Sequence, residues 1–157
     1  MNKKRILGIF LLTVILTQSS CDKSTVFHDF QRIENGIWRW DNPVDFSFHM
    51  DDSVGLHDIQ VQLRHSTEYP LSNLYMFVHI AGPSGQTITD TINFILAENS
   101  GKWIGKGVGN IRAIGYLYRK NTVFPDTGYY HVSIEQAMRL PEVPVKEIGL
   151  RVSKSNP

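Results

Sequence analysis

Cys21 is the residue best suited to covalent chemistry, and it is the only cysteine in a chain of 157 residues. The thiolate form of cysteine is a nucleophile, so this side chain can form a disulfide or accept an acyl group. A lone cysteine has no partner for an internal disulfide, and a free thiol is a liability in an oxidising compartment. Acylation is therefore the favoured reaction, and it requires a suitable signal sequence in the residues before Cys21.

Residues 1–20 have the layout of a secretory signal. Residues 1–5 are positively charged, residues 6–16 form an apolar run of 11 residues, and residues 17–20 are small or polar. This run is shorter than the ~20 apolar residues that span a bilayer. A cysteine directly after the small residues resembles a bacterial lipoprotein signal, although that motif usually has Leu where this chain has Gln18.

We therefore expect cleavage before Cys21 and a covalent lipid on its sulfur, with no other cofactor. Several acyl chains on one residue would hold the protein on a membrane surface more firmly than a single chain. Two alternatives stay open, namely an ordinary secretory signal followed by a free thiol, and a cysteine that is present by chance.

The other candidates for catalysis or metal binding lack the spacing that such sites require. The six histidines form no HExxH pair, and a His beside an Asp, as at His49 and His57, is typical of a solvated turn. Ser53 and Ser84 lie near glycines but do not match GxSxG. Residues 101–110, GKWIGKGVGN, lack the Ser or Thr that follows Lys in a P-loop, so we interpret them as a tight bend or bulge. The sequence predicts no enzyme activity and no metal site.

Aromatic residues are the remaining candidates for binding. Exposed tryptophans on a β-sandwich can stack on sugars, and Trp38, Trp40 and Trp103 would be the residues of such a surface. Burial in the core is the favoured interpretation, because aromatic side chains contribute heavily to the packing of sandwich interiors. Trp38 and Trp40 are two residues apart on an expected strand, so we expect both to be buried or both to be exposed.

The elements that must position these residues are strands. Alternating apolar and polar residues predict strands with one buried face over residues 44–50, 58–64 and 87–96. Residues 74–80, LYMFVHI, are apolar on both faces, which is typical of a central strand. Asp90 interrupts an apolar face, where a polar group needs a partner. Further strands are expected over residues 37–40, 111–118, 129–134 and 147–152, and one helical turn over 134–140 with Ser133 as its cap.

These many short strands are separated by Gly, Pro and Asp turns, which indicates an all-β fold of the β-sandwich or jelly-roll type. We expect one domain over residues 29–157, joined to the lipid by a tether over residues 21–28. Loss of residues 1–20 leaves 137 residues with 13 basic and 15 acidic side chains, a net charge of −2. This near-neutral balance gives no electrostatic reason to expect nucleic acid as a partner.

Four blocks of the chain together resemble the GldH family, the H-type gliding-motility lipoproteins of the Bacteroidota. The blocks are RHSTEYPLSNLYMF at 64–77, DTINFILAENSGKWIGKGVG at 90–109, YYHVSIEQAMR at 129–139 and EIGLRV at 147–152. The resemblance implies a cell-envelope lipoprotein of the gliding machinery, which is linked with type IX protein secretion. Since the family has no established catalytic residues, the resemblance carries over only the lipidated cysteine, at Cys21.

Two functions from different classes follow. The leading hypothesis is a non-enzymatic accessory lipoprotein, anchored by Cys21 to a membrane, which we expect to be the outer membrane, and acting through contacts with other envelope proteins. An exposed edge strand or a patch of exposed aromatic residues would be its docking surface. The alternative is a glycan-binding module on the same fold, which would display two or three aromatic residues with polar neighbours on one face.

Overall fold

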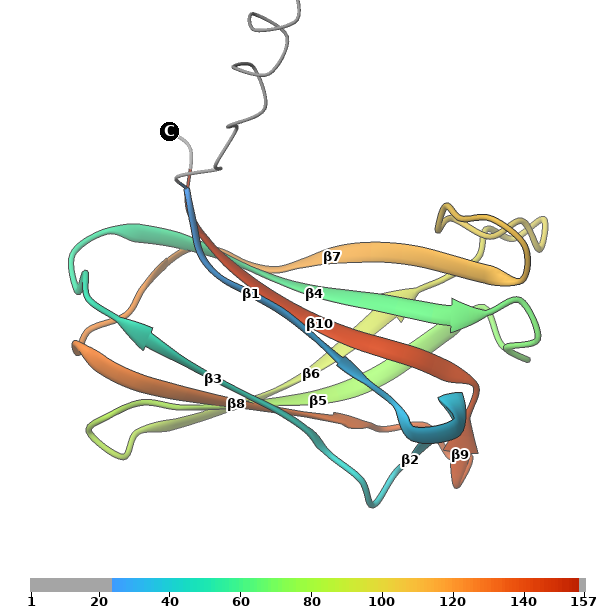
Figure 1. Cartoon of the computed structure of the whole chain (residues 1–157), viewed down its shortest axis with the longest axis horizontal. Coiled ribbons are helices and arrows are strands. Elements are labelled where there is room, and N and C mark those ends of the chain that lie inside the picture. Colours follow the sequence, from blue (N-terminus) through green and yellow to red (C-terminus); the bar gives the residue numbers. More distant parts are fainter. Residues whose placement is uncertain (1–23, 156–157) are drawn as a thin grey trace, which may run out of the picture.

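The computed structural model describes residues 24–155, which form two antiparallel four-stranded sheets packed face to face (Figure 1). The first sheet has the strand order β1-β10-β4-β7 and the second has the order β3-β8-β5-β6, and β2 pairs with β9 in a separate two-stranded sheet. The all-β sandwich expected from the sequence is therefore confirmed. The elements are β1 Thr25–Arg32, η1 Glu34–Gly36, β2 Trp38–Arg39, β3 Val44–Met50, β4 Leu56–Ser66, β5 Asn73–Ala81, β6 Thr87–Ile95, β7 Ile111–Val123, β8 Gly128–Gln136, β9 Glu142–Val143 and β10 Val145–Lys154.

The core lies between the two sheets and follows directly from the alternation of the strands. On β4, Ile59, Val61 and Leu63 are buried while the residues between them face outward. On β3, all four apolar residues are buried and all three polar residues are exposed. The strict period of two places every second side chain on the same face of a sheet, which is why the sequence pattern located these strands.

Strand β5 occupies the central position that its composition predicted, between β8 and β6. Its inward residues are buried, but Tyr75 and Phe77 on the opposite face are partly exposed to solvent. A strand that is apolar on both faces is typical of a sheet covered on both sides. Within residues 24–155, no other element covers the outer face of β5 as a third layer.

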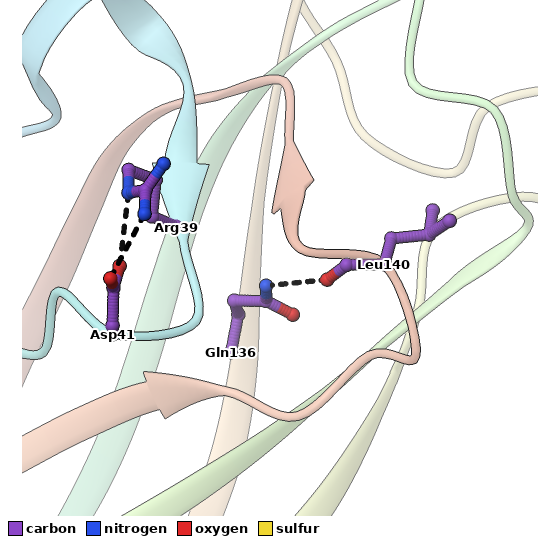
Figure 2. Close-up of polar contacts among 4 residues, drawn as sticks. All are labelled: Arg39, Asp41, Gln136 and Leu140. Carbon is purple, nitrogen blue, oxygen red and sulfur yellow. Dashed lines mark hydrogen bonds and ion pairs between the residues drawn. The ribbon is translucent and has the colours of Figure 1, made fainter.

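The expected helical turn over residues 134–140 is wrong. Residues up to Gln136 continue β8, where Ser133 pairs with Asp45 of β3 and with His79 of β5. Ile134 pairs with both neighbouring strands, and Glu135 and Gln136 continue the pairing with β5, so these residues are held in a ladder rather than in a turn of helix. After Gln136 the chain turns, and the Gln136 side chain holds the turn by donating a hydrogen bond to the carbonyl oxygen of Leu140 over 3.0 Å (Figure 2).

The sequence predicted no strand before residue 37, but β1 covers Thr25–Arg32. Residues 25–28, which we assigned to the tether, already belong to β1 and pair with the end of β10, as in the pairing of His28 with Arg151. The part of the expected tether outside the sandwich is therefore shorter than predicted. The rest of the predicted leader and tether, residues 1–23, lies outside the described residues.

Candidate functional site

The predicted lipidation site, Cys21, lies outside the described residues, but the structure shows where the chain that follows it enters the sandwich. The Ser24 carbonyl oxygen accepts a hydrogen bond from the Lys154 amide over 2.7 Å, and the Ser155 amide donates to the Leu56 carbonyl oxygen over 2.8 Å. The beginning of β1, the end of β10 and the beginning of β4 therefore lie together at one end of the sandwich. A lipid on Cys21 would be attached only three residues before this point.

The three tryptophans do not form the aromatic surface considered from the sequence. Trp38 is completely buried and donates its indole N–H to the Asn42 carbonyl oxygen over 2.9 Å. Trp40 is 58% exposed. Trp103 is partly buried and packs at 4.8 Å from the ring of His65. Since Trp38 is sealed inside the core, it cannot contribute to a binding face.

The expectation that Trp38 and Trp40 share a face is wrong because the strand ends between them. Strand β2 contains only Trp38 and Arg39, and the Asn42 amide bonds the Arg39 carbonyl oxygen over 3.2 Å to close a turn. The Arg39 guanidinium holds the Asp41 carboxylate through two hydrogen bonds of 2.9 and 3.0 Å across this turn (Figure 2). The turn rotates the backbone, so the period of two no longer relates the two indole rings.

Two histidines that the sequence placed in turns or left unassigned are core residues. His57 and His65 are completely buried, and the Nδ1 atom of each bonds a nearby backbone carbonyl oxygen. Burial lowers the pKa of His65, so its ring stays neutral inside the protein. Both histidines are in step with the apolar residues of β4, and this shared parity is the signal that could have revealed their burial. Within residues 24–155, no group of three or more His, Cys, Asp or Glu side chains is placed to hold a metal ion.

The glycine-rich segment 101–110 forms a bend, as expected. It connects β6 to β7 and folds back so that Lys106 and Ala113 bond to each other through both backbone groups, over 3.0 and 2.8 Å. A Cβ atom on Gly107 would lie 2.1 Å from the Ile111 carbonyl oxygen, so only glycine fits this close approach. The segment leads into a strand rather than a helix, unlike a P-loop.

Asp90, the polar residue on an otherwise apolar face, has the partners that the sequence required. Its carboxylate accepts a hydrogen bond from the Tyr118 hydroxyl and another from the Arg119 guanidinium, the latter over 2.6 Å. These two hydrogen bonds lower the pKa of Asp90. Burial, together with the bond to Asp90, raises the pKa of Tyr118 to about 12. The cluster joins β6 of one sheet to β7 of the other.

Strand β6 is the edge of its sheet and has few of the features that normally protect an edge. Edge strands usually carry Lys, Pro or a bulge, which discourage pairing with another chain. Strand β6, TITDTINFI, has neither Lys nor Pro and pairs with β5 over nine residues without a register shift. Its only charged residue, Asp90, is held by β7. By contrast, the edge strands β1 and β7 contain register shifts and charged residues. The edge strand β3 resembles β6 in having no Lys, Pro or register shift, but it is shorter, with seven residues against nine.

A hollow of about 260 Å³ lies beside this edge. Its lining includes Ile88 of β6, Val123 at the end of β7 and Tyr130 of β8. Ile88 is 45% exposed although it is in step with the buried residues of its strand. A strand added to β6 could place an apolar side chain in this hollow, so backbone pairing and side-chain burial would be available at the same place.

Comparison with known proteins assigns the chain to a family. The model of the GldH lipoprotein family matches residues 25–152, which is almost all of the sandwich. The chain belongs to the GldH lipoprotein family. It is 33% identical over 156 residues to the gliding motility lipoprotein GldH homolog of Christiangramia forsetii, covering 94% of each chain. It is 32% identical to the gliding motility lipoprotein GldH of Flavobacterium johnsoniae, covering 95% of this chain and 96% of the relative.

Solved structures resemble the chain only weakly. A chain of infectious bursal disease virus, Gx strain, matches 85% of this chain with a TM-score of 0.34 and 12% identity, and this chain covers 30% of that one. The VP2 subviral particle of the same virus gives a TM-score of 0.32 and 12% identity, with 89% and 41% of the two chains covered. These TM-scores are too low to indicate a shared fold. Among residues 24–155, the structure contains no helix with the length and apolar character needed to cross a membrane.

Proposed function

We propose that this GldH family member is a non-enzymatic accessory lipoprotein of the gliding machinery, linked to type IX secretion. It is held by a lipid on Cys21, at the outer membrane, and acts through contacts with other envelope proteins. The observation that carries the proposal is the family match over residues 25–152, since it spans the whole sandwich rather than a short motif. The names of the two relatives support the gliding role.

The anchor is the first part to test. Replacing Cys21 with Ser removes the thiol and leaves the sandwich unchanged, so the variant should lose label from a clickable fatty acid and move from the membrane to the soluble fraction. Gliding should fail in the same cells. A mature protein that stays on the membrane without the label would contradict lipid anchoring at this residue.

Edge strand β6 is the docking surface that the structure favours. An extended segment of a partner protein would continue the sheet β3-β8-β5-β6 by hydrogen bonding to the free edge of β6. Such pairing gives affinity through the backbone, and the hollow beside Ile88 would accept one apolar side chain of the partner. This arrangement uses the long, unbroken and nearly uncharged character of β6.

Replacing Ile88 with Lys would test this surface. A charge that points inward at an edge blocks strand addition, so crosslinking in cells should recover partner proteins with the unchanged chain but not with Ile88→Lys. Leu117→Lys is the matched control, because Leu117 is 47% exposed on the other sheet and Ile88 is 45% exposed. Equal recovery with both variants would place the partner elsewhere. No envelope protein recovered with the unchanged chain would remove the support for a docking role.

A further inference from the structure

The outer face of the sheet β1-β10-β4-β7 contains a row of residues with two glycines. The strand register aligns Phe30 of β1, Gly149 of β10, Gln62 of β4 and Gly115 of β7 across the sheet. Adjacent strands normally present a side chain at every position of such a row. Two missing side chains therefore leave the backbone uncovered unless neighbouring residues lean over it.

Side chains of β1 cross over Gly149 and reach β4. A Cβ atom on Gly149 would lie 2.6 Å from the ring of Phe30, so the ring rests on the glycine backbone. His28 bonds the Gln62 side chain with 2.8 Å between Nε2 and Oε1, although β10 separates their strands. The Arg64 guanidinium lies 4.5 Å from the centre of the Phe30 ring. His28, Phe30 and Arg64 thus form one wall, in which the cation and the ring attract each other.

A hollow of about 330 Å³ lies beside this wall, over the junction of β4 and β7. Ala113 leaves its floor low, because its side chain is only a methyl group. Gly115 is covered by the Gln60 amide, since a Cβ atom on this glycine would lie 2.8 Å from Gln60 Nε2. Small-molecule sites have volumes of about 300–1,000 Å³. The hollow therefore has the size for one or two residues of a chain molecule and is open to solvent along the sheet.

The hydrogen-bonding groups around the hollow are unbalanced. The Oε1 atom of Gln62 accepts from His28, and the Oε1 atom of Gln60 accepts from the Gln62 amide over 3.0 Å. The Arg64 guanidinium bonds Glu147 only through Nη1. Within residues 24–155, the Gln60 amide nitrogen and the Arg64 Nη2 atom have no hydrogen-bond partner. The two amide oxygens each accept a hydrogen bond already, whereas these two donor nitrogens have no protein partner, so a ligand with acceptor oxygens would suit them.

The local net charge is positive, which also favours a ligand that carries acceptor oxygens. Arg32 and Arg64 both pair with Glu147, which leaves a net charge of +1 on this row of three side chains. A carboxylate is the complement of a guanidinium, and hydroxyl oxygens can accept from the free amide. Glycan binding was the alternative considered for the tryptophans, but this face contains none of them.

We propose that this hollow binds an acidic sugar, with its carboxylate at Arg64 and its hydroxyl oxygens at Gln60. The pyranose ring would lie over Ala113, beside the Gln60 amide that covers Gly115. This activity is independent of the gliding role, so either can fail without the other.

A calorimetric titration would test the proposal on the full chain purified from membranes in detergent. Oligogalacturonate is the probe, and neutral galactose oligomers and inorganic phosphate are the comparison ligands. We expect a dissociation constant on the order of 1 mM for oligogalacturonate and no saturable heat with neutral oligomers. Phosphate that binds as tightly as oligogalacturonate would overturn a sugar site, and the absence of oligogalacturonate binding would overturn the proposal entirely.

Two variants locate the site. Arg64→Gln should weaken binding about tenfold or more, whereas Arg39→Gln should have little effect, because Arg39 pairs with Asp41 and does not line the hollow. Ala113→Leu fills the hollow from an exposed position and should also abolish binding. Thermal melting of each variant checks that it is folded. Oligogalacturonate binding that survives both Arg64→Gln and Ala113→Leu would show that the sugar binds elsewhere.

Discussion

The two long sides of the sandwich are closed in different ways. On one side, Phe27 of β1 packs against Phe46 and Phe48 of β3, with ring centres 6.3 and 5.4 Å apart. On the other side, Asp90 of β6 binds Tyr118 and Arg119 of β7. Both sides solve the same problem, which is to bring the edge of one sheet close to the edge of the other.

The difference shows what each closure allows. Apolar contact is non-directional and grows with the buried area, so the Phe27 side can be packed tightly next to the point where the chain enters the sandwich. The hydrogen-bonded Asp90 holds β6 to β7 at one place, and Phe94 of β6 packs against Tyr116 of β7 at 5.2 Å. Neither closure pairs the backbone at the sheet edges, since β3 on the apolar side and β6 on the polar side are both edge strands.

The largest expected effect comes from breaking the apolar closure. Phe48 is buried and its ring contacts Phe27, Phe124 and Tyr130. Phe48→Ala should lower the free energy of unfolding by about 3–5 kcal/mol, because it removes the contacts and leaves a cavity. Urea denaturation measures the loss. Phe77→Ala on the exposed outer face is the control and should change stability much less; equal losses would show that the ring cluster at Phe48 does not hold this side.

Breaking the polar closure should have a smaller effect. Asp90→Ala leaves the Tyr118 hydroxyl and the Arg119 guanidinium without their common acceptor, and both side chains are partly exposed to water. We expect a loss of about 1–2 kcal/mol in the same denaturation experiment. Asp29→Ala, which removes an exposed carboxylate bonded only to Gln31, should be close to neutral. A neutral Asp90→Ala variant would mean that Phe94 and Tyr116, which pack at 5.2 Å, close this side alone.

The smallest expected effect is a pH dependence of stability, which Asp90 should contribute and the apolar contacts of Phe48 should not. Because the folded-state pKa of Asp90 is lowered by its hydrogen bonds, its contribution is fully present above the unfolded pKa of about 3.9 and is lost as the pH falls through the folded value. The stability difference between the unchanged chain and Asp90→Asn should therefore shrink below about pH 4. The difference for Phe48→Ala should not follow this titration. A constant Asp90→Asn difference down to pH 2 would contradict an ionised, hydrogen-bonded Asp90.

Alternation along the chain was sufficient to predict most strands, since the period of two is a local property of extended backbone. It placed Val44, Phe46, Phe48 and Met50 on one buried face, and it required a partner for Asp90. It failed where the chain stops being extended, as between Trp38 and Trp40. It also could not show that residues 134–136 continue a strand, because pairing with β3 and β5 decides that.

The sequence by itself determined the all-β class, the inward faces and the resemblance to a family of lipoproteins. The order of the strands, and with it every contact across a sheet, was decided only by the tertiary structure. The strand order places β6 at an edge of its sheet and brings Tyr118 and Arg119 next to Asp90. It also aligns Gly149 with Gly115, so that His28 can reach Gln62. The physical reason is that these contacts join residues 28 or more positions apart, and a period of two contains no information about which distant strands become neighbours.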